Sequence, residues 1–131
     1  ILKLLDNQKF KVKKHSAKIQ GHHGSYLECC EIAEFSDDII FFVEDDYLFE
    51  KKCIEEMLFT YSRISSIINN DIILCPSDYP FFYDSLYDTN IFIGKDYKWR
   101  SVGETLLTFM FSKNIFNNHK KNIRLVGEKK K

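Results

Sequence analysis

The sequence predicts an α/β domain with an open, mostly parallel sheet, flanking helices and one antiparallel hairpin. Ile39 to Val43 form an uninterrupted β-branched and aromatic run, which is typical of a strand buried on both faces in a helix-covered parallel sheet. An amphipathic stretch, Lys51 to Ile68, follows this run, and Ile72 to Leu74 begins a second strand. Helices that alternate with strands in this way form right-handed crossovers in a layered α/β fold.

The residues before the central run predict short extended segments and one helix. Ile1 to Leu5 and Phe10 to Val12 are expected to be extended. Ser25 and Glu28 have the spacing of a capping box, in which each side chain satisfies a free backbone donor at a helix start. Apolar residues recur at helical spacing behind this box, so a helix is expected to end near Phe35.

The C-terminal half predicts a hairpin, a strand and a short helix after an aromatic, turn-rich segment, Asp78 to Thr89. Asn90 to Gly94 and Trp99 to Val102 are expected to pair as an antiparallel hairpin. Thr105 to Phe111 is expected to form another strand, and Lys113 to Asn122 a helix. We find no internal repeat, low-complexity tract or second domain, so residues 1–131 are expected to form a single domain.

The composition is that of a folded domain, because 44% of the 131 residues are hydrophobic. The sequence begins with Ile1 rather than Met, and we expect it to be a piece of a longer protein. The net charge is zero, but eleven acids lie between Glu28 and Glu56 while both ends are rich in lysine. This acidic centre favours cations as partners and disfavours nucleic acid.

The four cysteines lack CxxC spacing and lie in apolar stretches: Cys29, Cys30, Cys53 and Cys75. Buried, reduced thiols explain this pattern better than a zinc site or a disulfide framework. We therefore expect a cytoplasmic protein. No apolar run approaches the length of a membrane span, so any membrane association of the full-length protein is expected to come from residues outside this stretch.

Three consecutive carboxylates, Glu44, Asp45 and Asp46, follow the central strand directly. In an open α/β sheet, ligands bind beyond the carboxyl ends of the strands, where these acids are expected to lie. Adjacent anions repel one another unless a cation is bound or the side chains diverge into water. Hard oxygen ligands at this density suit Mg²⁺ or Mn²⁺, with a diphosphate completing the coordination. The alternative is a loop or helix cap that binds no ion.

IIFFVEDDYL resembles the strand and the Asp-x-Asp or Glu-x-Asp signature of bacterial GT-A glycosyltransferases. GSYLECCEIAEFSDD, CPSDYP and KWRSVGETLLTFMFS resemble further segments of this family in the same order, so the resemblance covers about Gly24 to Ser112. It implies a partial, Rossmann-like GT-A catalytic core. The implied activity is metal-dependent transfer of a sugar from a nucleotide-sugar donor to a glycan, lipid or protein acceptor.

The resemblance also implies roles for the acids. Asp46 corresponds to the direct ligand of Mn²⁺ or Mg²⁺, Glu44 to a contact with the ribose or a metal-bound water, and Asp45 to a support between them. The family's first strand and its base-contacting loop are not recognisable, and Tyr79 stands where one subgroup often has His. We therefore expect an N-terminally truncated fragment that is inactive by itself.

An inverting transfer also requires a carboxylate base that deprotonates the acceptor hydroxyl. Asp78 and Glu104 are the candidates, and their structural alternatives are a turn former and a capping residue. Trp99 and Arg100 are candidates to contact a sugar ring and a phosphate. Their alternative is a core tryptophan beside a solvated arginine.

Two other classes of function are compatible with parts of the pattern. A Mg²⁺-dependent phosphotransferase or nuclease also places acids at strand ends, but it needs carboxylates from further strands, and Asp71 precedes its strand. A non-enzymatic nucleic-acid-binding module would use the basic ends, which lack interleaved aromatic residues. We therefore expect a nucleotide-sugar partner and no nucleic acid.

Overall fold

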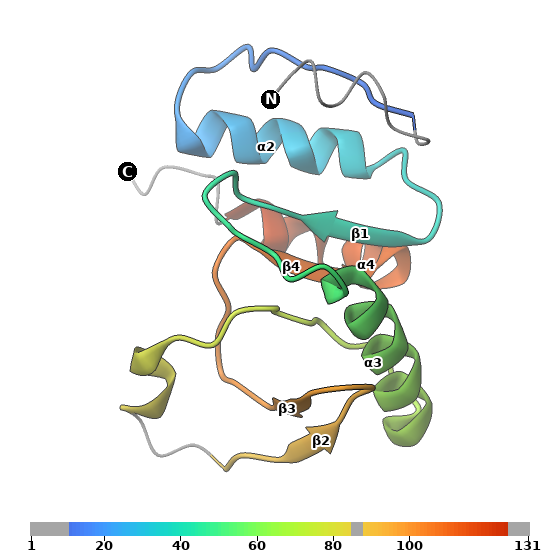
Figure 1. The fold of residues 1–131 in the computed structure, drawn as a ribbon. Coiled ribbons are helices and arrows are strands. Elements are labelled where there is room, and N and C mark those ends of the chain that lie inside the picture. Colours follow the sequence, from blue (N-terminus) through green and yellow to red (C-terminus); the bar gives the residue numbers. More distant parts are fainter. Residues whose placement is uncertain (1–10, 85–87, 126–131) are drawn as a thin grey trace.

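The computed structural model of the protein describes residues 11–84 and 88–125. In chain order the elements are α2 (His22–Ala33), β1 (Ile39–Phe42), α3 (Cys53–Ile68), the 3-10 helix η1 (Pro80–Tyr83), β2 (Ile91–Ile93), β3 (Lys98–Arg100), β4 (Phe109–Ser112) and α4 (Lys113–Leu125). Figure 1 shows β1 and β4 at the centre, with the β2–β3 hairpin on the side away from α2.

The central sheet is antiparallel. β1 pairs with β4 so that Ile40 lies opposite Phe111 and Phe42 opposite Phe109. On the other side of β4, Met110 forms an antiparallel bridge with Leu74, and each backbone N–H donates to the partner's carbonyl oxygen at 2.8 Å. β4 therefore lies between β1 and the segment that contains Leu74.

The predicted fold class, an open, mostly parallel and Rossmann-like sheet, is wrong. The described residues form two short antiparallel sheets, β1–β4 and β2–β3, and contain no parallel pair. Because β1 and the Leu74 segment are both antiparallel to β4, they run in the same direction without being neighbours. β4, the last strand among the described residues, thus lies between two segments that run parallel to each other.

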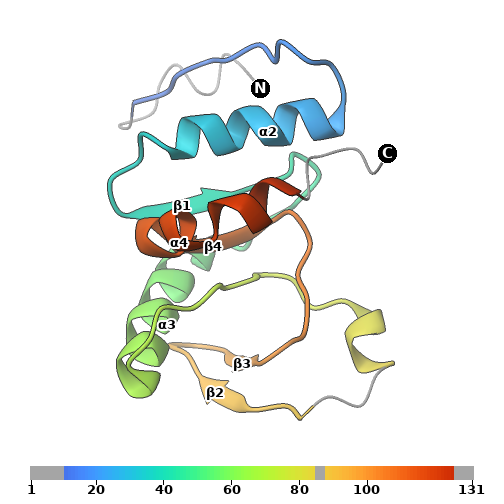
Figure 2. The same ribbon diagram turned by 180° about the vertical axis from the view of Figure 1, so that it is seen from behind.

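Helices cover both faces of the β1–β4 sheet, which explains why β1 is apolar throughout. One face packs in a core with α2 and α4: Tyr26, Cys30, Ala33, Ile40, Phe42, Phe109, Phe111, Ile115, Phe116 and Ile123. The other face packs against α3 and its neighbours: Met57, Leu74 and Met110, with Ile39, Phe41, Cys53, Tyr61, Ile72 and Trp99 at the margin. In Figures 1 and 2, α3 lies on the side of this sheet that faces the hairpin, and α2 on the opposite side.

Most of the local elements agree with the sequence predictions. The hairpin is confirmed, with Phe92 opposite Trp99 and Lys95 in the turn. Helices α3 and α4 are confirmed within a few residues of their predicted ends. The predicted strand Ile72 to Leu74 is reduced to a single bridge, and the strand predicted from Thr105 begins only at Phe109.

The predictions for the N-terminal part are less successful. Ile1 to Leu5 and Phe10 lie outside the described residues, and Val12 has no regular secondary structure. The capping box is wrong because α2 begins at His22, three residues before Ser25, and the N-cap position receives no side-chain hydrogen bond. Glu28 instead accepts a hydrogen bond from the backbone N–H of Lys18.

Contacts between α2 and α4 fix the layer that supports β1. The Lys113 ammonium donates to the carbonyl oxygens of Ala33 and Glu34 at 2.7 and 2.8 Å, and so satisfies carbonyl groups that have no partner within α2. The buried Tyr26 hydroxyl donates to the carbonyl oxygen of Ile123 at 3.0 Å. The two helices are therefore joined at both ends.

The four cysteines are free thiols, but they are not uniformly buried. Cys30 is buried, Cys53 and Cys75 are half-buried, and Cys29 is exposed. The expectation of buried thiols is thus right for Cys30 and wrong for Cys29. None of the helices within the described ranges is long and apolar enough to cross a lipid bilayer.

Candidate functional site

A cleft of about 1200 Å³ lies beside the β2–β3 hairpin. Its walls come from residues 47–50 after β1, residues 72–78, part of α3, both hairpin strands and the loop 101–105 before β4. Six aromatic side chains contribute to the lining: Tyr47, Phe49, Tyr83, Phe92, Tyr97 and Trp99. Four carboxylates do so as well: Glu50, Glu56, Asp78 and Glu104. The cleft therefore combines apolar rings with acidic groups.

The predicted site residues divide into two groups. Asp78, Trp99, Arg100 and Glu104 all line the cleft. The acidic residues 44–46 are not among its lining residues, although the chain enters the cleft wall immediately after them, at Tyr47. Figures 1 and 2 agree that the carboxyl end of β1 and helix η1 lie on the same side of the molecule.

The acidic residues form a turn after β1. Glu44 is half-buried, its backbone N–H donates to the Thr108 hydroxyl at 3.1 Å, and His22 Nε2 lies 4.0 Å from its carboxylate. Asp45 and Asp46 are exposed. Within residues 11–84 and 88–125, no group of three or more His, Cys, Asp and Glu side chains is placed to hold a metal ion.

This donor set still fits a divalent ion that is shared with a ligand. Mg²⁺ is commonly held by one or two carboxylates together with substrate phosphates and water, rather than by a cage of protein ligands. Glu44 and Asp46 each carry carboxylate oxygens of this hard type, and Asp46 is open to solvent. An ion enclosed by the protein alone does not fit these residues.

Arg100 is held between a carboxylate and an aromatic ring at the η1 side of the cleft. Its Nη2 donates to Asp78 Oδ1 at 2.9 Å, and its guanidinium carbon lies 3.9 Å from the centre of the Tyr83 ring. The Tyr83 hydroxyl donates to the other oxygen of Asp78. The bond from Tyr83, supported by Arg100, holds the pKa of Asp78 below its ordinary value. Asp78 is therefore a poor proton acceptor.

Glu104 differs from Asp78 in having no partner. It is exposed in the loop before β4, lines the cleft, and makes no hydrogen bond or ion pair with any residue that the structure describes. It caps no helix, so the structural role that the sequence allowed is not observed. Of the two predicted bases, Glu104 is the one whose carboxylate is available to a ligand.

Glu56 is the residue that the sequence analysis missed. It is only 4% exposed, and its carboxylate accepts four hydrogen bonds. The donors are the Thr60 hydroxyl at 3.0 Å, the backbone N–H groups of Lys95 at 3.1 Å and Asp96 at 2.7 Å, and the Trp99 indole at 2.8 Å. Burial alone would raise the pKa of Glu56, but these donors outweigh it and hold the pKa below its ordinary value.

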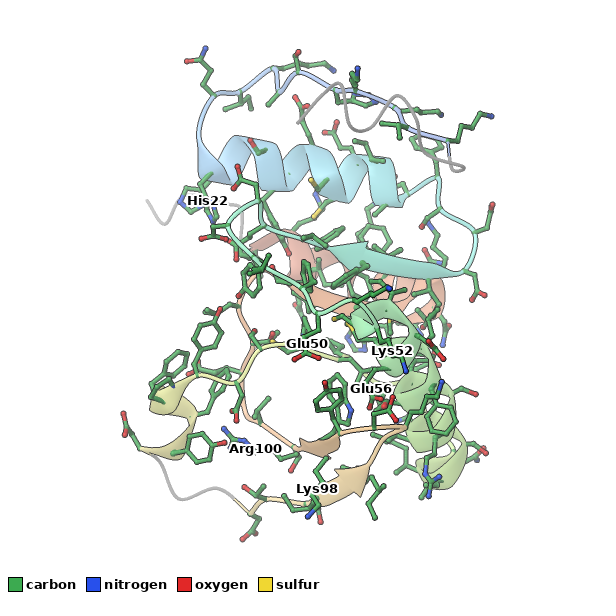
Figure 3. All side chains as sticks on the ribbon, viewed as in Figure 1. His22, Glu50, Lys52, Glu56, Lys98 and Arg100 are labelled. Atoms are coloured by element: carbon green, nitrogen blue, oxygen red, sulfur yellow. The ribbon has the colours of Figure 1, made fainter. Side chains whose placement is uncertain are left out.

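The bonds to Glu56 attach the hairpin to α3 and so position β3. A Cβ atom at Gly94 would lie 2.1 Å from Glu56 Oε1, so the turn approaches the carboxylate only because residue 94 is glycine. In Figure 3, Glu56 and Arg100 lie near opposite ends of β3, and His22 lies away from both. The available sequence signal is the spacing of Glu56, Thr60 and Ile64, which places two polar residues on the buried face of α3.

Trp99 combines the two roles that the sequence left open. It is half-buried against the core beneath α3, and its indole N–H is taken by Glu56, as expected for a structural tryptophan. It also lines the cleft. Trp99 therefore lines the cleft while its polar edge is fixed by Glu56.

Two tyrosines join the segments that follow β1 and Leu74. The hydroxyl groups of Tyr47 and Tyr79 share a hydrogen bond, which connects the segment after the acidic turn to the segment after Leu74. This bond, together with burial, raises the pKa of Tyr79. The residue that follows the acidic turn and the residue that follows Asp78 are thus joined directly.

Comparisons of the chain with protein-family models, with curated proteins and with solved structures gave no significant match.

Proposed function

We propose that this chain is the catalytic part of a metal-dependent glycosyltransferase, which transfers a sugar from a nucleotide-sugar donor to a glycan, lipid or protein acceptor. The observation that carries the proposal is the meeting of Asp78, Trp99, Arg100 and Glu104 in one cleft, with the acidic turn next to its wall. A guanidinium, aromatic surfaces and an unpartnered carboxylate suit a phosphate group, a ring and an acceptor hydroxyl, respectively.

In this proposal Glu104 is the base. Its carboxylate is exposed within the cleft and unpartnered among the described residues, so it can accept the proton of an acceptor hydroxyl. Asp78 is not assigned this role because Tyr83 and Arg100 already occupy both of its oxygens. Arg100 contributes positive charge for an anionic part of the donor.

Glu44 and Asp46 are the residues that would hold Mn²⁺ or Mg²⁺. When bound, such an ion acts as a Lewis acid that neutralises the charge developing on the departing nucleotide diphosphate. The free thiols support the further proposal that the protein works in the reducing environment of the cytoplasm.

Calorimetric titration with UDP and with GDP, each with and without Mn²⁺, tests the proposal. We expect binding that requires Mn²⁺ and that Asp46→Asn abolishes. Asp37→Asn is the matched control, because Asp37 is an exposed acid at the other end of β1 and its removal changes the net charge equally. Binding that ignores Mn²⁺, or equal binding by the two variants, would contradict the proposal.

Glu104→Gln separates binding from chemistry. We expect this variant to bind the nucleotide like the unmodified protein, and to lose sugar transfer in this chain or in any longer chain that contains it. Release of phosphate from a nucleotide without any transfer of sugar would support the phosphotransferase class instead.

A further inference from the structure

We propose that Arg100 is the binding site for a phosphate group of the ligand, and that Asp78 occupies this site until the phosphate displaces it. The identity of the ligand as a nucleoside diphosphate rests on the proposed function. The exchange itself rests on the geometry around Arg100, and it makes Asp78 an internal competitor rather than a base.

The bond between Arg100 and Asp78 uses the guanidinium incompletely. Asp78 divides its oxygens between two partners, because Oδ1 accepts from Arg100 Nη2 at 2.9 Å and Oδ2 accepts from the Tyr83 hydroxyl. A carboxylate or phosphate that matches a guanidinium fully accepts two parallel bonds from it. The observed pair is therefore weaker than the one that Arg100 is able to form.

Arg100 also has a donor without an acceptor. Its Nε atom is buried and has no hydrogen-bond partner in the part of the chain that the structure describes. An unpaired buried donor is costly, so a ligand that satisfies it gains the bond and removes this cost. A phosphate that bonds Nε and Nη2 together must replace Asp78, which already holds Nη2.

The two partners differ in exposure in the way that an exchange requires. The Arg100 side chain is 18% exposed and lies against the Tyr83 ring, so it is held in place. The Asp78 side chain is 58% exposed and can rotate into water. Ion pairs with a partner this exposed contribute little stability, so a phosphate with more negative charge can compete with Asp78.

Helix η1 need not move during this exchange. Phe82 in its centre is 5% exposed and remains packed when Asp78 leaves Arg100. The Asp78 side chain rotates and releases both Arg100 and the Tyr83 hydroxyl, while the Tyr83 ring continues to support the guanidinium. The site is thus preformed apart from one competing side chain.

Calorimetric titration with inorganic pyrophosphate, with and without Mg²⁺, tests the exchange. We expect Asp78→Asn to bind pyrophosphate about three- to fivefold more tightly than the unmodified protein. The reason is that the Asp78 carboxylate, whose exposed ion pair with Arg100 is weak, no longer competes with pyrophosphate for the guanidinium. Asp84→Asn is the matched control: Asp84 follows η1, is exposed, and lies outside the Arg100 contact, so it changes the charge equally. We expect Arg100→Lys to bind at least about tenfold more weakly, because bidentate bonding is lost.

The Asp78→Asn and Asp84→Asn pair decides the outcome even if Arg100→Lys fails to fold. Equal affinities for the two variants, weaker binding by Asp78→Asn, or no binding by the unmodified protein would overturn the inference. If Asp78→Asn tightens pyrophosphate binding but no nucleotide binds in a Mn²⁺-dependent manner, the exchange stands and the proposed function fails. If nucleotide binds in a Mn²⁺-dependent manner but Asp78→Asn does not tighten pyrophosphate binding, the proposed function stands and the exchange fails.

Discussion

Replacement of Glu56 by glutamine is expected to destabilise the protein, because it alters a buried carboxylate that accepts four hydrogen bonds. The variant keeps the shape of the side chain but replaces one carboxylate oxygen by an NH₂ group. Because the backbone N–H groups of Lys95 and Asp96 are bonded to different oxygens, the new NH₂ group must face one of these donors. One bond is lost, and the remaining bonds no longer have a charged acceptor.

The expected loss can be worked from these contacts. A hydrogen bond to a charged group contributes about 1.5 to 3 kcal/mol, and a neutral one about 1 kcal/mol. One charged bond is lost and three become neutral, while removal of the buried charge relieves part of its desolvation cost. We expect Glu56→Gln to lower the free energy of unfolding by about 3 kcal/mol, a large part of the 5 to 15 kcal/mol that is typical of a domain.

The assay is urea unfolding at pH 7, followed by Trp99 fluorescence and by far-ultraviolet circular dichroism. Trp99 is the only tryptophan, and its indole N–H bonds Glu56, so its fluorescence reports on this site. Glu55→Gln is the matched control, because Glu55 is the exposed neighbour that pairs with Lys95. We expect the control to change the unfolding midpoint little.

The stability difference between the unmodified protein and Glu56→Gln is expected to depend on pH. The folded-state pKa of Glu56 lies below its ordinary value of 4.5, so its contribution is present above that value and is lost as the pH falls through the lower, folded-state pKa. The difference between the unmodified protein and Glu56→Gln is therefore expected to shrink below about pH 4.5. An unchanged midpoint at pH 7, or a difference that persists undiminished in acid, would refute the role assigned to Glu56.

Three further predictions concern packing and thiol chemistry. Gly94→Ala is expected to destabilise the hairpin, because the Cβ atom of the new alanine would meet the Glu56 carboxylate. A thermal unfolding midpoint no lower than that of the unmodified protein would disprove the close approach of residue 94 to Glu56. Tyr26→Phe removes the bond to α4 and is expected to cost about 1 kcal/mol in urea unfolding; a neutral effect would count against this bond. Burial raises the pKa of the Cys30 thiol to about 11. Iodoacetamide at pH 8 is therefore expected to modify the exposed Cys29 before Cys30. Mass spectrometry that shows Cys30 modified first would contradict the burial of Cys30.

The sequence predicted local elements well because their signals are local. The period of apolar residues identified α3, and the turn residues around Lys95 identified the hairpin. The direction of the sheet was not predictable in this way. A strand covered by helices on both faces is apolar whether its neighbour is parallel or antiparallel, and the insertion of β4 beside β1 is a pairing between distant parts of the chain.

The candidate site was predictable to a similar extent. The resemblance pointed to Asp78, Arg100 and Glu104, and the structure places all three in the cleft. It could not distinguish Asp78 from Glu104 as a base, because only the folded chain shows that Tyr83 and Arg100 donate hydrogen bonds to both oxygens of Asp78. Glu56 was missed because an acid in an amphipathic helix normally faces water, and its donors come largely from a turn much later in the chain.

The central claim is that the cleft beside the hairpin binds a nucleoside diphosphate together with a divalent ion. Two-dimensional ¹⁵N–¹H nuclear magnetic resonance spectra, recorded while Mg²⁺ and UDP or GDP are added, test it most directly. We predict that the single indole resonance of Trp99 and the backbone amides of Tyr47, Asp78 and Arg100 shift together with one affinity. Shifts confined to α2 and α4, or no shifts at saturating nucleotide, would contradict the account.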